Sequence, residues 1–345
     1  MSRDWDKICD FENLYQGHQN VKKERKMKSE TVRFEQNLAY ELATLQARLV
    51  TGTYQMKSYF HFEVYEPKRR SIYAAHHIDK ILMNTVCEQV LIPRLSPHFI
   101  YDNGACQKGK GVHFSIRRFK KHLTDYFCAH GQHGYVLKCD ISKYFASIDH
   151  DILKQKLVKR IKDPDVTRLL SDLIDTYHTE GHPGVGIPLG NNTSQWFALY
   201  YLSDFDHFVK EQLGVRGYVR YMDDFVLIGR SKAELWSCFA QIQMAIGELG
   251  LTLNRNCDVF PMRSGVEFLG WRFFVMKSGR IMMRLRTQSK KRYLKKIKIL
   301  EAKYRTGYYD LQKINRILAS HHGHLIHGHA FSLEEQAMMR MALVR

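Results

Sequence analysis

Two adjacent aspartates, Asp223 and Asp224, interrupt a stretch of sequence that is otherwise typical of buried β-strands. Neighbouring carboxylates repel each other, and a bound cation is the natural compensation for that repulsion. Because hard oxygen ligands favour Mg²⁺ or Mn²⁺, the pair is a candidate part of a site for such an ion. The simpler alternative is an exposed polar turn, which is the usual role of a lone Asp-Asp pair.

Asp140 is a third carboxylate of this kind, since it ends the apolar segment Gly134–Asp140. If this segment and the strands around Asp223 are neighbours in one sheet, the three carboxylates converge at one edge. They can then hold two metal ions roughly 3.5–4 Å apart, which stabilise an attacking and a leaving oxygen. The alternative for Asp140 is a carboxylate that caps the next turn. Phe145 either packs beside a bound sugar or is a core aromatic.

The elements that position these carboxylates follow from the hydropathy pattern. Gly134–Asp140 is predicted as a buried strand, and Gly217–Gly229 as two strands around a two-residue turn formed by the aspartates. Gly265–Phe274 is predicted as one strand that forms a hairpin with Arg280–Leu285. Helical patterns dominate both ends of the chain. This order predicts an α+β fold with an antiparallel sheet.

Charge points to a polyanionic partner. The chain has 345 residues, with 53 Lys and Arg against 35 Asp and Glu, which gives a net charge of +18. From Arg280 to the C-terminus there are 15 basic and 4 acidic residues, an excess of 11. A solvated helix face is the alternative, but the adjoining carboxylates favour nucleic acid. The basic residues expected on a nucleic-acid duplex are Lys290, Lys291, Arg292, Lys295 and Lys296.

Other features narrow the class of protein. Seven cysteines are scattered without a C-x-x-C pair, which is typical of a reducing cytoplasm, and nearly all are expected to pack in or near the core. No apolar run approaches the ~20 residues that a membrane span needs, and the N-terminus has no secretory signal. Five histidines between His321 and His329 have spacings that occur in zinc sites, although a place in an ordinary helix is preferred.

These segments resemble the conserved blocks of reverse transcriptases. Tyr221–Asp224 resembles the YxDD motif, and Asp140 with Phe145 resembles motif A, in which an aromatic residue blocks a ribose 2′-hydroxyl. Gly186–Gln195 resembles motif B, which lies beneath the base pair being formed, and Phe268–Trp271 resembles the primer grip. The blocks occur in the family's order over most of the chain.

The resemblance implies a right-hand polymerase fold, with fingers mostly in residues 1–130, a palm with an antiparallel sheet mostly in 131–275 and a basic helical thumb in 276–345. It implies two Mg²⁺ ions, or Mn²⁺, as cofactors. The implied partners are template RNA, a primer or cDNA strand and dNTPs.

Three aspartates are implied as catalytic, and the metal-contacting residues are Asp140, Ile141, Asp223 and Asp224. The nucleotide-binding residues are Lys68, Arg70, Phe145, Leu189, Gly190, Ser194 and Gln195. The primer-grip residues are Phe268, Leu269, Gly270 and Trp271.

Within this family, the sequence is most similar to reverse transcriptases of diversity-generating retroelements. Most bacterial and group II intron enzymes have Gln-Gly and Ser-Pro in motif B, whereas this chain has Leu189-Gly190 and Ser194-Gln195. The resemblance implies mutagenic retrohoming, in which cDNA copied from a template RNA carries errors at adenines. It also implies a bacterial, archaeal or phage-encoded enzyme and a small, basic accessory protein that assembles into a ring.

Other functions remain as alternatives: a retron or group II intron-type reverse transcriptase, or an inactive RNA-binding scaffold with a polymerase fold. The chain also departs from the family in motif D, where a lysine after the asparagine is proposed as an acid for pyrophosphate. Here that place reads Asn256-Cys257, with Arg255 beside it. The chemistry is therefore expected to depend more on the metals.

Overall fold

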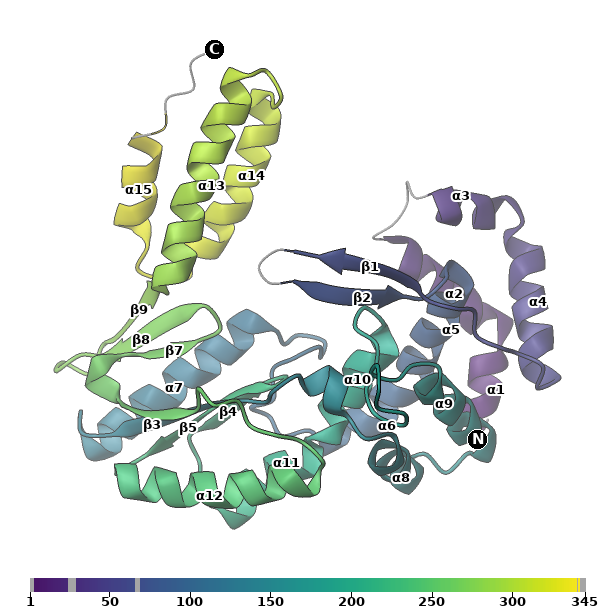
Figure 1. The fold of residues 1–345 in the computed structure, drawn as a ribbon, viewed down its shortest axis with the longest axis horizontal. Coiled ribbons are helices and arrows are strands. Elements are labelled where there is room, and N and C mark those ends of the chain that lie inside the picture. The colour runs from purple at the N-terminus through teal and green to yellow at the C-terminus, as the bar shows by residue number, and fades with distance from the viewer. Residues whose placement is uncertain (1–2, 24–28, 66–68, 340, 342–345) are drawn as a thin grey trace. The chain divides into compact units, whose positions relative to one another are not determined.

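The structure, a computed structural model, describes residues 3–23, 29–65, 69–339 and 341 (Figure 1). The chain folds into two compact units, each built from segments that are far apart in sequence. Unit 1 contains residues 1–111, 141–214 and 240–255. Unit 2 contains residues 112–140, 215–239 and 256–345.

Unit 1 is mainly helical, and its buried apolar side chains include Leu14, Leu42, Leu45 and Ile81. Its one sheet pairs β1 (Phe60–Val64) antiparallel with β2 (Arg70–Ala74). Its α-helices are α1 (Asp4–Cys9), α2 (Phe11–Lys23), α3 (Ser29–Gln36), α4 (Leu38–Val50), α5 (His77–Val86), α6 (Ile92–Leu95), α8 (His150–Arg160), α9 (Pro164–Asp175), α10 (Asn192–Tyr201) and α11 (Ser203–His207).

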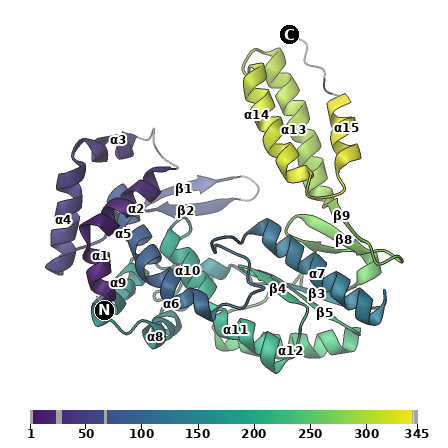
Figure 2. The same ribbon diagram turned by 180° about the vertical axis from the view of Figure 1, so that it is seen from behind.

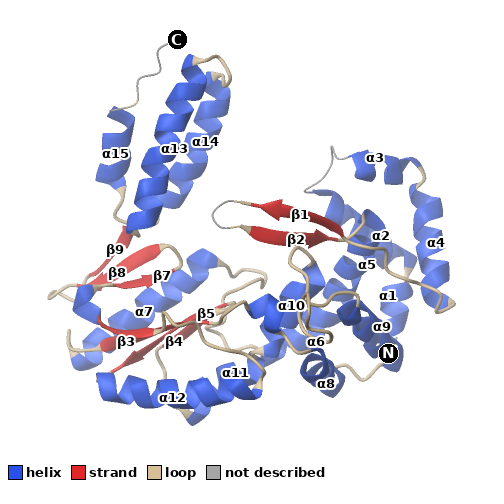
Figure 3. Ribbon diagram, viewed as in Figure 1, coloured by secondary structure: helices blue, strands red, loops and turns tan. Residues whose placement is uncertain are grey.

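Unit 2 contains two antiparallel sheets, drawn in red in Figure 3. One has the order β4-β5-β3-β6 and the other β7-β8-β9. The strands are β3 (Tyr135–Asp140), β4 (Tyr218–Tyr221), β5 (Asp224–Gly229), β6 (Asp258–Pro261), β7 (Val266–Phe268), β8 (Trp271–Val275) and β9 (Ile281–Leu285). The helices are α7 (Val112–His130), α13 (Thr287–Arg305), α14 (Leu311–Leu325) and α15 (Phe331–Met339), and α12 (Lys232–Glu248) begins in this unit. No helix of the described residues is long and apolar enough to cross a membrane.

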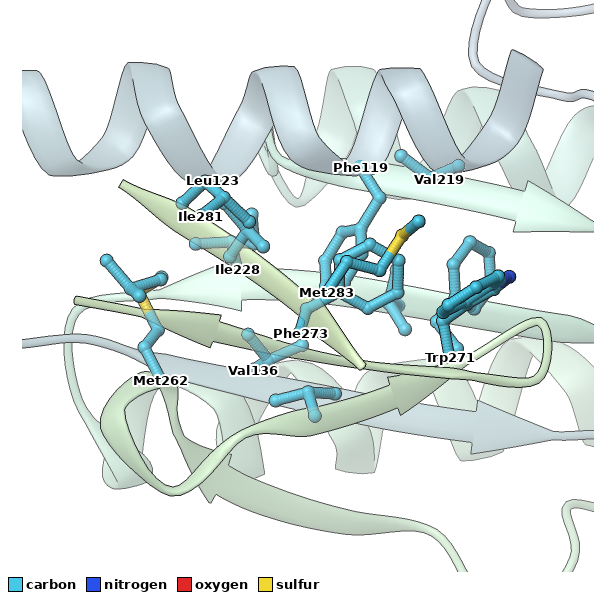
Figure 4. Close-up of a cluster of buried hydrophobic side chains, with 14 of the residues drawn as sticks. Phe119, Leu123, Val136, Val219, Ile228, Met262, Trp271, Phe273, Ile281 and Met283 are labelled. Carbon is cyan, nitrogen blue, oxygen red and sulfur yellow. The ribbon is translucent and has the colours of Figure 1, made fainter. Parts of the chain in front are cut away.

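Helix α7 and the two sheets of unit 2 share one core (Figure 4). Figures 1 and 2, which view the molecule from opposite sides, both show α7 lying along the strands. Phe119 on α7 makes an edge-to-face contact with Phe273 on β8, with ring centroids 5.0 Å apart. Burial alternates along β8, since Trp271, Phe273 and Val275 are buried while the residues between them are half-buried. This alternation is the sequence signal of a strand with one face in the core.

The structure corrects the predicted strand Gly265–Phe274, because this stretch forms two strands, β7 and β8. Leu269 and Gly270 form the turn between them, with φ angles of 48° and 85°. Two successive residues with positive φ produce the tight reversal that suits the twist of an antiparallel hairpin. Hydropathy alone did not show this reversal because Leu269 is apolar and continues the pattern.

Burial along β8 leads to a paired prediction. Phe273→Ala should lower the free energy of unfolding by about 3–5 kcal/mol, because it leaves a cavity between α7 and the sheet. Phe274→Ala removes the same atoms from the half-buried face, where Arg272 lies over the ring at 5.3 Å, and should cost clearly less. Urea denaturation of both variants measures the difference. Equal losses would contradict the assignment of β8's two faces.

Candidate active site

Three aspartates meet at one end of the four-stranded sheet, where its two central strands, β3 and β5, lie side by side. The antiparallel register of β3 and β5 pairs Asp140 directly with Asp224. In the β4–β5 hairpin Tyr221 pairs with Asp224, so Asp223 lies in the two-residue turn beside them. The structure therefore places the three carboxylates at one sheet edge, as the sequence predicts.

The turn itself differs from the prediction. It consists of Met222 and Asp223 rather than the two aspartates, because Asp224 is already the first residue of β5. Met222 has a φ of 57°, in the left-handed region that residues other than glycine rarely adopt. The buried Arg220 donates a hydrogen bond from Nη1 to the Met222 carbonyl at 2.9 Å. Arg220 thus supports the turn from the core, a role that its place in an apolar strand could have suggested.

Asp224 lies in surroundings that disturb its ionisation. Its Oδ1 atom is buried, with no hydrogen-bond partner in the described part of the chain. Burial, together with the carboxylates of Asp140 and Asp223, raises the pKa of Asp224 to about 7, although Lys138 and Arg286 act in the opposite direction. Lys138 Nζ lies 3.9 Å from Asp224 Oδ2. Negative charge at this edge is therefore only partly compensated by the protein.

A divalent cation fits this donor set. The ligands are carboxylate oxygens, which suit Mg²⁺ and Mn²⁺, and the unpartnered Oδ1 of Asp224 is an open coordination position. Among residues 3–23, 29–65, 69–339 and 341, no three His, Cys, Asp or Glu side chains already form a chelating group.

Two thiols adjoin the carboxylates. Cys257, immediately before β6, donates a weak hydrogen bond from Sγ to the backbone oxygen of Asp140 at 3.9 Å. A hydrogen bond from the Cys139 thiol lowers the pKa of Cys257 to about 7 and raises the pKa of Cys139 itself. Cys257 stands where the family's motif D suggests a lysine. Neither β6 nor this thiol contact was predicted from the sequence.

The predicted nucleotide-binding residues belong to unit 1, apart from Lys68, which lies outside the described residues. Backbone hydrogen bonds join their segments. Tyr73 N on β2, the strand that begins at Arg70, donates to Leu189 O at 3.0 Å, and Ile187 N donates to Phe145 O at 2.8 Å. The motif B segment therefore connects β2 to the segment that carries Phe145.

The exposure of these residues differs. Arg70, Gly190 and Gln195 are exposed, Phe145 and Leu189 are half-buried, and Ser194 and Ile141 are buried. The exposed group is thus the part of the set that can reach a ligand without rearrangement. A cavity of about 210 Å³ adjoins this segment, and its lining includes Gly190, Asn191, Lys80, Asn84 and Asn20.

The predicted primer-grip residues form the β7–β8 turn of unit 2. Phe268 and Trp271 are fully buried in the core, while Leu269 and Gly270 at the turn are half-buried. The Gly270 carbonyl accepts a hydrogen bond from the backbone N–H of Arg286 at 3.2 Å. The turn is therefore tied to the residue that precedes α13.

Helix α13 has a basic face and an apolar face. Tyr293, Ile297 and Leu300 are buried, and Tyr293 and Ile297 pack in a cluster with residues of α14 and α15. The basic residues predicted to contact a duplex lie outside this buried stripe: Lys290, Lys291, Arg292 and Lys295 are exposed, and Lys296 is half-buried. This separation suits a helix that presents positive charge to a phosphate backbone.

A sheet that carries three carboxylates at one end, followed by a basic helical segment, is the arrangement expected of a nucleic-acid polymerase. Residues 68–273, more than half of the chain, match the family described as reverse transcriptase (RNA-dependent DNA polymerase), and the chain belongs to this family. Protein YkfC of Escherichia coli (strain K12) is 26% identical over 283 residues, which cover 70% of this chain and 73% of that protein.

A solved structure of apo telomerase from Candida tropicalis resembles the chain with a TM-score of 0.50 and 13% sequence identity. The likeness covers 66% of this chain and 48% of the telomerase chain, so this chain spans about half the length of that relative. At this identity the likeness concerns the fold alone. It confirms the predicted α+β polymerase fold with antiparallel sheets.

The Arg220 contact leads to a second prediction. Arg220→Met keeps a long side chain but leaves the Met222 carbonyl without its buried donor, which should cost about 1–3 kcal/mol of unfolding free energy. Amide hydrogen exchange at the turn should accelerate as well. Arg216→Met, at an exposed position just before β4, is the matched control. If both variants are equally stable, the turn does not depend on Arg220.

Proposed function

We propose that this chain synthesises DNA on an RNA template, with Asp140, Asp223 and Asp224 as its catalytic carboxylates. The observation that carries the proposal is the β3–β5 register, which pairs Asp140 with Asp224 next to Asp223. Membership of the reverse transcriptase family supports template RNA, a primer strand and dNTPs as partners. We assign residues 1–130 mostly to fingers, 131–275 mostly to palm and 276–345 to thumb.

In this mechanism the three aspartates, with the backbone of Ile141, would hold the metals. When bound, two Mg²⁺ or Mn²⁺ ions supply Lewis acidity to the attacking 3′-oxygen and the leaving pyrophosphate. Lys68 and Arg70 neutralise the triphosphate, while Phe145 packs against the sugar. The basic face of α13 binds the duplex backbone. An inactive scaffold is disfavoured, because clustered carboxylates without a metal are costly to keep partly buried.

Charge-removing substitutions test the catalytic assignment. Asp140→Asn and Asp223→Asn keep side-chain size, and each should slow primer extension with Mg²⁺ at least about 100-fold, since metal stabilisation of the transition state is worth several kcal/mol. RNA binding in a filter assay should be nearly unchanged. Asp125→Asn is the control, because Asp125 pairs with Lys121 on the exposed face of α7. Near-normal extension by either active-site variant would remove the assignment.

We further propose the narrower role of a diversity-generating retroelement enzyme, which makes adenine-mutagenised cDNA with a basic, ring-forming accessory protein. Motif B supports it, since Leu189 has no side-chain hydrogen bond to offer where a glutamine is usual. The backbone of this segment is held independently of that side chain, because Leu189 O accepts from Tyr73 N at 3.0 Å. A changed side chain at position 189 therefore alters the nucleotide pocket without dismantling its support.

Error spectra test this role. Leu189→Gln restores a hydrogen bond worth roughly 0.5–1.5 kcal/mol, so misincorporation should fall by up to about tenfold. Leu189→Met keeps the volume without the hydrogen bond and should behave like the unsubstituted protein. The readout is sequencing of cDNA made on a template with all four bases, where errors should concentrate at adenines. Evenly distributed errors would favour the retron or intron-type alternatives instead.

A further inference from the structure

Cys139 and Cys257 face each other across two neighbouring strands of unit 2. The β3–β6 register ends with Lys138 opposite Asp258, and Cys139 and Cys257 are the next residues beyond that pair. A side-chain hydrogen bond joins their thiols. The Cys257 thiol reaches the Asp140 backbone oxygen at 3.9 Å, which confirms that its side chain lies beside β3. The two thiols are thus adjacent in space although they are far apart in sequence.

The geometry of this pair suits a covalent bond. At the other end of the two strands, Met262 N donates to Gly134 O at 3.0 Å, which marks a hydrogen-bonded pair. Hydrogen-bonded and non-hydrogen-bonded pairs alternate along an antiparallel ladder. The alternation makes Tyr135–Pro261 a non-hydrogen-bonded pair, as it must be because proline has no N–H. If the same alternation is continued past the last pair, Lys138 and Asp258, the two cysteines occupy a non-hydrogen-bonded position.

Residues in such a pair have Cα atoms about 4.5 Å apart, with their side chains close together. A disulfide needs Cα atoms at roughly 4.4–6.8 Å. The backbone positions of Cys139 and Cys257 therefore permit a disulfide without a change of register.

Access to the two thiols is unequal. Cys139 is buried, with 1% of its surface exposed, whereas Cys257 is half-buried. A small oxidant would reach Cys257 first.

Cys106 and Cys128 are exposed, which corrects the expectation that nearly all cysteines pack in or near the core. A thiol is polar enough to be tolerated at the surface. These two provide the comparison for general thiol oxidation.

We propose that Cys139 and Cys257 are a site of oxidation by hydrogen peroxide, and that their disulfide slows the polymerase by removing the Cys257 S–H donor from the Asp140 carbonyl. The Cys257 sulfur attacks one peroxide oxygen, the O–O bond breaks, and water leaves, which produces a sulfenic acid. The Cys139 sulfur then attacks the sulfenic sulfur, the S–O bond breaks, and a second water leaves with the thiol proton. Two thiols lose two electrons, and one peroxide becomes two waters.

The effect on the active site follows from position. Asp140 directly follows Cys139, and its carbonyl accepts the Cys257 hydrogen bond. A disulfide draws the sulfurs to about 2.05 Å and removes the Cys257 S–H donor. The loss of one such hydrogen bond beside a catalytic carboxylate is worth up to about a tenfold change in rate, so primer extension should fall by up to about tenfold and recover with dithiothreitol. This activity effect depends on the proposed polymerase function, whereas disulfide formation does not.

The experiment treats the full chain with hydrogen peroxide. Peptide mapping by mass spectrometry should find Cys139 linked to Cys257, with the loss of two hydrogens, reversibly with dithiothreitol. The double variant Cys106→Ser and Cys128→Ser, the matched control, should form the same link and lose activity to the same degree. Cys257→Ser should form no link and keep its own pre-treatment activity. Cys139→Ala should likewise form no link and resist inactivation. If this substitution of a buried residue prevents folding, Cys257→Ser alone tests the proposal.

Two results would overturn the proposal. The absence of a Cys139–Cys257 link in treated, folded protein would remove the oxidation site. A link that forms while primer extension stays unchanged, or equal inactivation of Cys257→Ser, would remove its coupling to catalysis. If no preparation extends a primer even when reduced, the polymerase function fails, and the peptide map still decides whether the oxidation site exists.

Discussion

The pairing of β3 with β5 is the constraint on which the active site depends. Its register brings Asp140 opposite Asp224, although the two residues come from distant parts of the chain. A slip of one residue would turn each side chain of β3 to the other face of the sheet. Buried residues on both strands, such as Val136 and Leu227, oppose such a slip. The core of unit 2 therefore determines where the carboxylates meet.

This arrangement concentrates negative charge that the protein compensates only in part. Lys138 lies 3.9 Å from Asp224, yet burial and the nearest carboxylates still raise the pKa of Asp224 to about 7. The turn beside it adds a left-handed Met222, held by the buried Arg220. Local conflicts of this kind persist where surrounding structure maintains them, and they are characteristic of functional sites. The proposed metal site would give this conflict a physical reason.

Strand β3 has neighbours on both sides, and each contributes to the chemistry at its end. β5 brings Asp224 to Asp140, while β6 brings Cys257 to Cys139. The oxidisable thiols and the catalytic carboxylates are consequently joined through consecutive residues of one strand. A change in the β3–β6 pairing would be transmitted to Asp140 over a single peptide bond. The proposed oxidation effect needs no separate regulatory domain.

The sequence by itself determined which residues carry charge and which elements they end: the strand up to Asp140, the aspartates beside Tyr221 and the basic stretch of α13. These signals are local, since carboxylates that interrupt apolar strands and cations at helical spacing are visible without knowing any partner. Tertiary structure decided that Met222 occupies the turn, that Leu269 ends a strand, and that Cys257 lies opposite Cys139. These features depend on register and on backbone dihedral angles, which are set by pairing between segments far apart in the chain, and such pairing has no signature within either segment alone.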